Sequence, residues 1–287
     1  MDRKKLHKNE RIGISLFLLL PALLVWWPLW FMLTSAFMPA DELTATIGPA
    51  LGLAGGDSIW HLFPSWPTLL PVLSLLLDTP QFFVVFWNTV GQTFAQMAGQ
   101  LLVGIPAAWA LSVLRFRGRG FLRLLYLALM LMPFTATMVP SYLILRAFGW
   151  IDTVWAIIVP GVFSTFPVFI MQKWFDNIPN AIIEAAKIDG ASPEGILWRI
   201  GVPLGAPGIL AAMTLSFFEA WNAVEQPMTF LRRPENWPLA LYLGNFEGAD
   251  IGAAMTASFF TLLPAVLIFR FGQKYLEQGI QMGAVKE

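Results

Sequence analysis

Six long apolar stretches are the feature that most constrains how this chain can fold. Each is at least about as long as the roughly 20 residues that cross a bilayer as an α-helix, and each contains few charged residues. Lipid offers no hydrogen-bond partner to an open backbone, so we expect an all-α integral membrane protein with six transmembrane helices. We place these spans at residues 12–37, 82–114, 122–148, 154–175, 202–224 and 251–271.

The composition supports this class and excludes several others. Of the 287 residues, 57% are hydrophobic and 13% are charged, whereas soluble domains carry roughly a quarter charged residues. The net charge of zero gives no basic surplus for nucleic acid. The chain has no cysteine and two histidines, His7 and His61, which argues against disulfides, iron–sulfur clusters and zinc sites. We therefore expect no metal and no cofactor in this chain.

The basic residues predict the orientation of the spans. All but Arg146, Arg232 and Arg233 lie in segments that share one side of the membrane if both termini are cytoplasmic. The first span is too long for a cleaved signal core, so we expect it to be retained. The predicted organisation is a cytoplasmic basic tail (1–11), a first transmembrane helix (12–37), an extracytoplasmic loop (38–81), a permease core (82–273) with a cytoplasmic loop at 177–203, and a cytoplasmic tail (274–287).

The extracytoplasmic loop differs in character from the rest of the chain. It is rich in tryptophan, proline and glycine, and it contains acidic residues but no lysine or arginine. Its apolar stretch at 69–77 is too short to span a bilayer, and we expect it to lie along the outer interface.

Residues 177–204 predict a helical hairpin on the cytoplasmic side. Asn177 is placed to cap a helix that has Pro179 in its first turn. Gly190 suits a left-handed end to that helix, because glycine adopts positive φ without steric cost. Ser192 then caps a second helix. A compact hairpin of this kind can fill a groove in a partner protein.

This hairpin resembles the EAA loop of ATP-binding-cassette (ABC) importer permeases. The match rests on Glu184-Ala185-Ala186, Asp189-Gly190-Ala191 and Ile200-Gly201-Val202-Pro203. Trp221-Asn222 and the tail Gly283-Ala284-Val285-Lys286 resemble sugar permeases, and this tail, together with the six-span layout, is similar to the smaller permease of maltose-type carbohydrate systems. The ATPase-coupling residues implied by the resemblance are Glu184, Ala185, Ala186, Asp189, Gly190, Ala191, Ser192 and Pro193.

The resemblance implies a division of labour among several proteins. ATP and Mg would be bound by two separate ATP-binding-cassette ATPase subunits, which the tail Gly283, Ala284, Val285 and Lys286 would also contact. A second, related permease would complete the pore, and an extracytoplasmic solute-binding protein would deliver a sugar or oligosaccharide. The chain itself has no phosphate-binding loop of the form G-x-x-x-x-G-K-[ST]. The implied location is a bacterial or archaeal cell membrane.

Polar residues inside the predicted spans are candidates for a solute pathway. Amides spaced four residues apart share one face of a helix, and they are unfavourable in lipid unless they are paired. They therefore either join neighbouring helices or line a wet cavity, and the pattern favours neither interpretation. An intramembrane carboxylate is by default a functional candidate. The candidates are Asn88, Gln92, Gln96, Gln100, Glu219 and Asn222.

These features lead to one hypothesis of function and two rivals. We expect a permease subunit that moves a solute by alternating access and catalyses no covalent chemistry. An ion-driven secondary transporter would also fit the polar spans and Glu219, but it needs no coupling loop. An intramembrane enzyme would require a nucleophile and a base, which are hard to build from two histidines and no cysteine.

Overall fold

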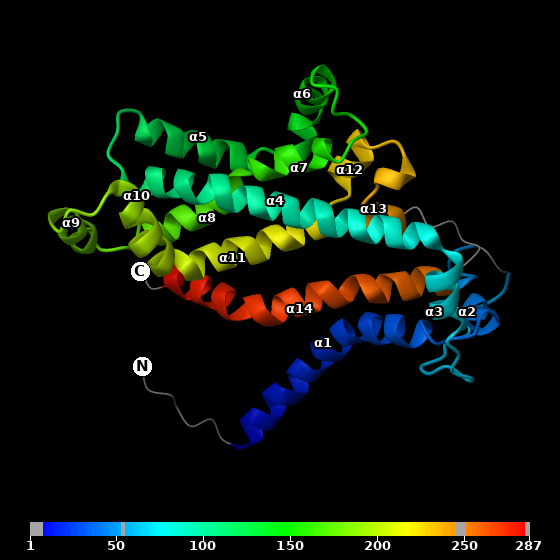
Figure 1. The fold of residues 1–287 in the computed structure, drawn as a ribbon. Coiled ribbons are helices and arrows are strands. Elements are labelled where there is room, and N and C mark those ends of the chain that lie inside the picture. The colour runs from blue at the N-terminus through cyan, green and yellow to red at the C-terminus, as the bar shows by residue number, and fades with distance from the viewer. Residues whose placement is uncertain (1–7, 53–54, 245–250, 285–287) are drawn as a thin grey trace. The chain divides into compact units, whose positions relative to one another are not determined.

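The computed structural model describes residues 8–52, 55–244 and 251–284, and its regular elements are all helices, with no strand among these residues (Figure 1). The chain forms two compact units. Unit 1 comprises Met1–Phe82 and Phe246–Leu262, and unit 2 comprises Phe83–Asn245 and Leu263–Glu287. The basic tail at 1–7 lies outside the described residues.

Five stretches of the described chain are long and apolar enough to cross a membrane, and they confirm five of the six expected spans. The first is α1 (Lys8–Ser35), which stays continuous through Pro21 and Pro28. The others are α4 (Pro80–Val113), the pair α7 (Trp155–Val162) and α8 (Thr165–Phe175), the run α10 (Pro193–Ile196), η2 (Leu197–Gly201) and α11 (Val202–Trp221), and α14 (Ile251–Ala284).

The expected third span is not one straight helix, which corrects the prediction for residues 122–148. It consists of α5 (Arg119–Leu131) and α6 (Phe134–Ala147), which are bent by 102° at the break. Met132 is extended, with φ −71° and ψ 123°, because Pro133 disfavours the helical conformation of the residue before it. Pro140, in contrast, lies inside α6. A pair bent in this way is either a broken span or a re-entrant loop.

Unit 2 is organised around α8 and α11, which make its most extensive helix pair. Two glycines of α11 allow this close approach. A Cβ added to Gly205 would lie 2.3 Å from the ring of Phe175, and one added to Gly208 would lie 2.1 Å from that of Trp174. Small residues at helix contacts are the common packing device in membranes, where apolar burial alone does not drive association.

The two ends of unit 2 carry different elements (Figure 1). The short helices α9 (Asn180–Ile188) and α10 lie at one end. The short helices α12 (Glu225–Phe230), η3 (Pro234–Asn236) and α13 (Leu239–Gly244) lie at the other end. The predicted loop at 177–203 thus lies at the end opposite to α12, η3 and α13, while the side of the membrane that each end faces stays a prediction.

A carboxylate organises the second of these ends. The Asp152 carboxylate accepts hydrogen bonds from the backbone N–H groups of Arg232 (2.9 Å) and Arg233 (3.0 Å) and from Nε of Arg233 (2.8 Å). Its backbone carbonyl accepts one from Nδ2 of Asn236 (2.8 Å). The loop after α6 is thereby joined to the segment after α12.

Unit 1 contains more structure than the expected loop at 38–81. It includes α2 (Ala40–Ile47), α3 (Leu70–Leu73) and η1 (Ser74–Asp78). The indole of Trp30 at the end of α1 donates to the carbonyl of Leu62 (3.2 Å), and its ring meets that of Phe63 edge-on at 5.5 Å. Part of the tryptophan-rich segment thus packs on α1, while its position at a membrane interface stays a prediction.

Candidate functional site

The cytoplasmic hairpin predicted from the sequence is present as α9, a turn at 189–192 and α10. Gly190 has φ +79°, as expected for the left-handed end of α9. The hydroxyl of Ser192 accepts a hydrogen bond from the backbone N–H of Gly195 (3.1 Å), which confirms it as the cap of the second helix. The hairpin therefore follows from its local sequence signals.

The predicted cap of the first helix is wrong. Pro179 occupies the N-cap position of α9, and Asn177 donates from Nδ2 to the carbonyl of Lys173 at 2.7 Å. The chain is extended at Pro179, with ψ 129°, so the helix begins at Asn180, beyond the reach of an Asn177 cap. Asn177 instead satisfies a carbonyl in the last turn of α8.

The hairpin buries one side and exposes the other. Ile183 and Ala186 pack into the core of unit 2 together with residues of α4, α8 and α11. Ile182 and Ile188 are exposed, and Ile188 retains 86% of its accessible surface. Glu184, Ala185, Asp189, Gly190, Ala191, Ser192 and Pro193 are also exposed. The exposed side of the hairpin therefore carries two apolar side chains, Ile182 and Ile188, among polar and small residues.

The second arm of the hairpin is longer than expected. Helices α10, η2 and α11 form one uninterrupted run from Pro193 to Trp221, whereas the sequence predicted a span starting at residue 202. The π-helical turn η2 carries the chain through Gly201, where an added Cβ would lie 2.5 Å from the ring of Trp109. The hairpin and the fifth span are therefore one continuous helical rod.

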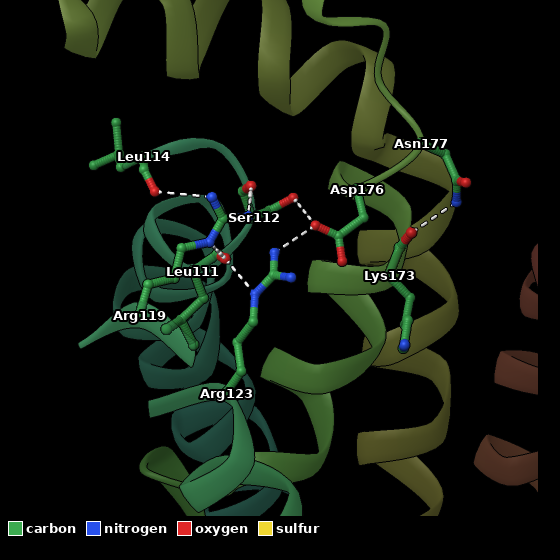
Figure 2. A network of polar contacts seen from close by, with 8 residues as sticks. All are labelled: Leu111, Ser112, Leu114, Arg119, Arg123, Lys173, Asp176 and Asn177. Atoms are coloured by element: carbon green, nitrogen blue, oxygen red, sulfur yellow. Dashed lines mark hydrogen bonds and ion pairs between the residues drawn. The ribbon is translucent and has the colours of Figure 1, made fainter. Parts of the chain in front are cut away.

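A polar network lies immediately before the hairpin and joins three helices (Figure 2). Arg119 and Arg123, at the start of α5, donate to carbonyls at the end of α4. Both Nε atoms reach Leu111 (2.8 and 2.7 Å), and Arg119 also reaches Ser112 and Leu114. These bonds satisfy carbonyls that the last turn of a helix leaves without intrahelical partners.

Asp176, the residue that ends α8, completes this network (Figure 2). Its Oδ1 accepts from the hydroxyl of Ser112 (2.6 Å) and from a terminal nitrogen of Arg123 (2.7 Å). The sequence interpretation used the arginines only to orient the spans and did not assign Ser112 or Asp176. Ser112 and Asp176 are 64 residues apart in the sequence. Local sequence patterns do not reveal partners at such a separation.

The four amides of α4 divide into two pairs. Nδ2 of Asn88 donates to the carbonyls of Glu235 (2.6 Å) and Trp237 (3.2 Å), and Nε2 of Gln92 donates to that of Asn236 (3.2 Å). These two residues hold the segment after α12 in place. Gln96 and Gln100 instead face Gly161 at the end of α7: Nε2 of Gln100 donates to its carbonyl at 2.9 Å.

Gln96 and Gln100 also line a cavity of about 800 Å³ in unit 2. Two further sequence candidates, Glu219 and Asn222, belong to the same wall, and both are exposed. The structure thus brings together four of the six pathway candidates, while Asn88 and Gln92 lie outside the lining. The lining also contains residues that the sequence interpretation missed, because they are near in space only: Thr137, Ser164, Thr165, Ser216, Glu225 and Gln226.

The tail candidates fall at the limit of the description. Gly283 and Ala284 are the last residues of α14. Val285 and Lys286 lie outside the described residues.

Comparison with known proteins decides the family. Residues 100–282, well over half of the chain and including the hairpin, match the family described as the binding-protein-dependent transport system inner membrane component. The chain belongs to this family. The resemblance inferred from the EAA-like segment is thereby confirmed, and the protein is a membrane component of a transport system.

Similar proteins cover nearly the whole chain. The inner membrane ABC transporter permease protein YcjP of Escherichia coli is 31% identical over 282 residues, 96% of this chain and 97% of the relative. The arabinooligosaccharides transport system permease protein AraQ of Halalkalibacterium halodurans is 27% identical, over 90% of each chain. In fold, the chain is similar to a bacterial ABC transporter involved in the import of the acidic polysaccharide alginate, with a TM-score of 0.79, 23% identity and coverage of 94% of this chain and 98% of that one.

Proposed function

We propose that this chain is a permease subunit of an ATP-driven, binding-protein-dependent importer of a sugar or oligosaccharide. The observation that carries the proposal is the exposed hairpin, whose second arm continues without interruption into a membrane span. Family membership supports a transport role, and the similarity to permeases named for arabinooligosaccharides and galactooligosaccharides supports the sugar class.

The proposed assembly has four other protein components. Two ATPase subunits bind ATP and Mg and contact the hairpin, a second related permease completes the pore, and an extracytoplasmic solute-binding protein delivers the solute. The chain spans a bacterial or archaeal cell membrane with both termini in the cytoplasm. The exposed Ile182 and Ile188 fit this arrangement, because they offer apolar surface to a groove in an ATPase subunit.

The continuous rod from Pro193 to Trp221 suggests how ATPase motion would reach the solute path. A displacement of the hairpin is transmitted along a helix without a flexible joint, and the far end of that helix carries Ser216 and Glu219 of the cavity wall. Closure of the ATPase pair would then shift the population between inward-facing and outward-facing states. In this scheme the chain moves the solute and performs no covalent chemistry.

The sequence also allowed an ion-driven secondary transporter. That alternative fits the acidic residue Glu219, but it leaves the exposed hairpin without a role. Membership of the binding-protein-dependent family argues against it.

Copurification tests the proposal. The chain, expressed with its neighbouring genes and extracted in a mild detergent, should carry two ATPase subunits whose ATP hydrolysis is stimulated by the loaded binding protein. Ile188→Asp places a charge on the most exposed apolar side chain of the hairpin and should reduce the recovered ATPase. An active transport preparation that lacks any ATPase would refute the proposal.

A further inference from the structure

Buried polar atoms without partners gather around the cavity of unit 2. Oε1 of Gln100 and Oγ of Ser216 have no hydrogen-bond partner in the described part of the chain, and both residues line the cavity. Gln100 is 4% exposed and Ser216 is 2% exposed. Buried polar groups without partners are rare because they are unfavourable. A polar occupant of the cavity could complete their hydrogen bonds after a small movement of the wall.

A broken helix forms another part of the wall. Helix α7 ends at Val162 and α8 begins at Thr165, and Phe163, Ser164 and Thr165 all line the cavity. The start of α8 receives no hydrogen bond from a capping side chain. The first N–H groups of a helix have no intrahelical acceptor, so they are available to an oxygen atom. Interrupted membrane helices that line a cavity commonly take part in solute binding.

The charges of the wall select among polar occupants. Glu219 and Glu225 line the cavity, and its described lining contains no lysine or arginine. The start of α8 contributes about half a positive charge, which is smaller than the negative charge of Glu225 alone. The field in the cavity is therefore negative, and it repels anions while leaving uncharged hydroxyl groups unaffected.

We infer that this cavity is a subsite for an uncharged, polyhydroxylated part of the solute, and that Glu219 and Glu225 exclude acidic saccharides such as uronates. The inference rests on the proposed function, since it adds a solute class to the pathway proposed there. Amides and hydroxyls around the cavity supply both donors and acceptors to sugar hydroxyls. A carboxylated sugar would bring a further negative charge to this acidic wall, and the described lining offers it no basic partner.

Charged thiol reagents test this field without knowledge of the solute. Ala223→Cys adds a single thiol to the cavity wall of a chain that has no cysteine of its own. In the complete transporter in proteoliposomes, this subunit is labelled with the hydroxyethyl, trimethylammonium-ethyl and sulfonatoethyl methanethiosulfonates. Each rate is divided by the rate with a free thiol in solution. Ionisation of the cysteine affects all three reagents equally and cancels in their ratios.

We expect the anionic reagent to react about tenfold more slowly than the neutral one, and the cationic reagent at least as fast as the neutral one. In the double variant Glu219→Gln/Glu225→Gln, the labelling rate of the anionic reagent should rise about tenfold. Ala147→Cys, at an exposed position outside the cavity lining, is the matched control, and its ratios should not change with the glutamate variants. If the double variant fails to assemble, the single variant Glu225→Gln should raise the labelling rate of the anionic reagent roughly threefold.

Equal rates for the neutral and anionic reagents would overturn the inference, and so would discrimination that persists in the double variant. Both outcomes leave the importer function intact, since copurification of the ATPase tests it separately. Absence of labelling in every nucleotide state would also overturn the inference, because the cavity would then not be part of a water-accessible pathway.

Discussion

Gly190 shows at the scale of one residue how the hairpin depends on backbone conformation. Its φ of +79° belongs to the left-handed region, and a Cβ added there would meet no atom within 4 Å. A side chain at this position is therefore unfavourable because of backbone strain and not because of a clash. The strain is about 1–2 kcal/mol for an ordinary residue and is greater for a β-branched one.

Gly190→Val should therefore distort the turn between α9 and α10 while the span still inserts. We expect lower solute uptake and weaker ATPase association, measured in proteoliposomes and by copurification. Gly190→Asn is the matched control, since asparagine tolerates positive φ, and it should behave nearly as the native protein. Normal uptake by a well-expressed Gly190→Val variant would contradict the coupling role of the hairpin.

Asp152 is a second residue whose surroundings determine its chemistry. The backbone N–H groups of Arg233 and Arg232, with the Arg233 guanidinium, hold the pKa of Asp152 at about 2, below its ordinary value of 3.8. Asp152 also has a positive φ of 62°, which aspartate and asparagine adopt more readily than most residues. The ionised carboxylate therefore stabilises the folded state above about pH 4, and this stabilisation is lost as the pH falls through about 2.

Asp152→Asn keeps the tolerated backbone conformation and removes the charge. We expect it to lower the melting temperature of the detergent-solubilised protein at pH 6, and we expect the difference from the native protein to shrink between about pH 4 and pH 2. Thermal unfolding followed by tryptophan fluorescence at several pH values measures this difference. A difference that does not depend on pH would show that the charge has no part in joining the two loops.

Among the elements, the junction of α4, α5 and α8 precedes the hairpin and positions its entry. Asp176 pairs with Arg123 and Ser112 while the arginines cover the end of α4 (Figure 2). The Arg123 and Asp176 side chains are 32% and 27% exposed. An ion pair at such a site contributes a few tenths to about 1 kcal/mol, so its effect is better detected as coupling between two substitutions.

A double-mutant cycle of Arg123→Gln and Asp176→Asn measures that coupling. Each single variant should lower both the thermal stability and the solute-stimulated ATP hydrolysis, and the double variant should be less damaging than the sum of the two. Arg117→Gln is the control, because Arg117 makes no ion pair with another described residue. Strictly additive losses would mean that the two side chains act independently.

Helix α4 carries four amides on one face, two bound to a neighbouring segment and two at the cavity. Asn88 and Gln92 bind carbonyls of the segment after α12, whereas Gln96 packs so close to Gly161 that an added Cβ would lie 1.9 Å from its Oε1. The sequence could not separate these roles, since all four amides follow the same spacing. Their partners in space distinguish them.

The two pairs should respond differently to substitution. Gln96→Leu should raise the solute concentration at half-maximal uptake, by an amount equivalent to about 0.5–1.5 kcal/mol, and should leave insertion intact. Asn88→Leu should lower the thermal stability and leave that concentration unchanged.

Cysteine at position 96 or 100 should react with a small water-soluble reagent in at least one transport state. Protection of both positions in every state would refute their place in the pathway.

For the whole molecule, the proposed function requires contact with an ATPase pair beyond the hairpin. We expect the tail after α14, including Gly283 to Lys286, to supply it. Deletion of the last six residues should lower solute-stimulated ATP hydrolysis more than it lowers complex assembly. Measurements of both on the same purified complex check this expectation, and unchanged stimulation or complete loss of assembly would reject it.

The sequence by itself determined the class of fold and the family. Apolar length predicted five of the spans, and local signals predicted the positive φ of Gly190 and the Ser192 cap, because these features depend on neighbouring residues alone. The EAA-like motif pointed to the family for the same reason, since its information lies in one short segment.

Only the tertiary structure decided how distant residues meet. It divided the third span at Met132–Pro133 with a bend of 102°, and it fused the hairpin to the fifth span. It paired Arg123 with Asp176 and assigned Gln96 and Gln100, but not Asn88 and Gln92, to the cavity. Hydropathy cannot predict these outcomes, because an apolar stretch with an internal proline is long enough to cross a bilayer whether its helix is straight or bent. A polar side chain in a membrane needs a partner, but its own sequence neighbourhood does not reveal which helix or cavity supplies it.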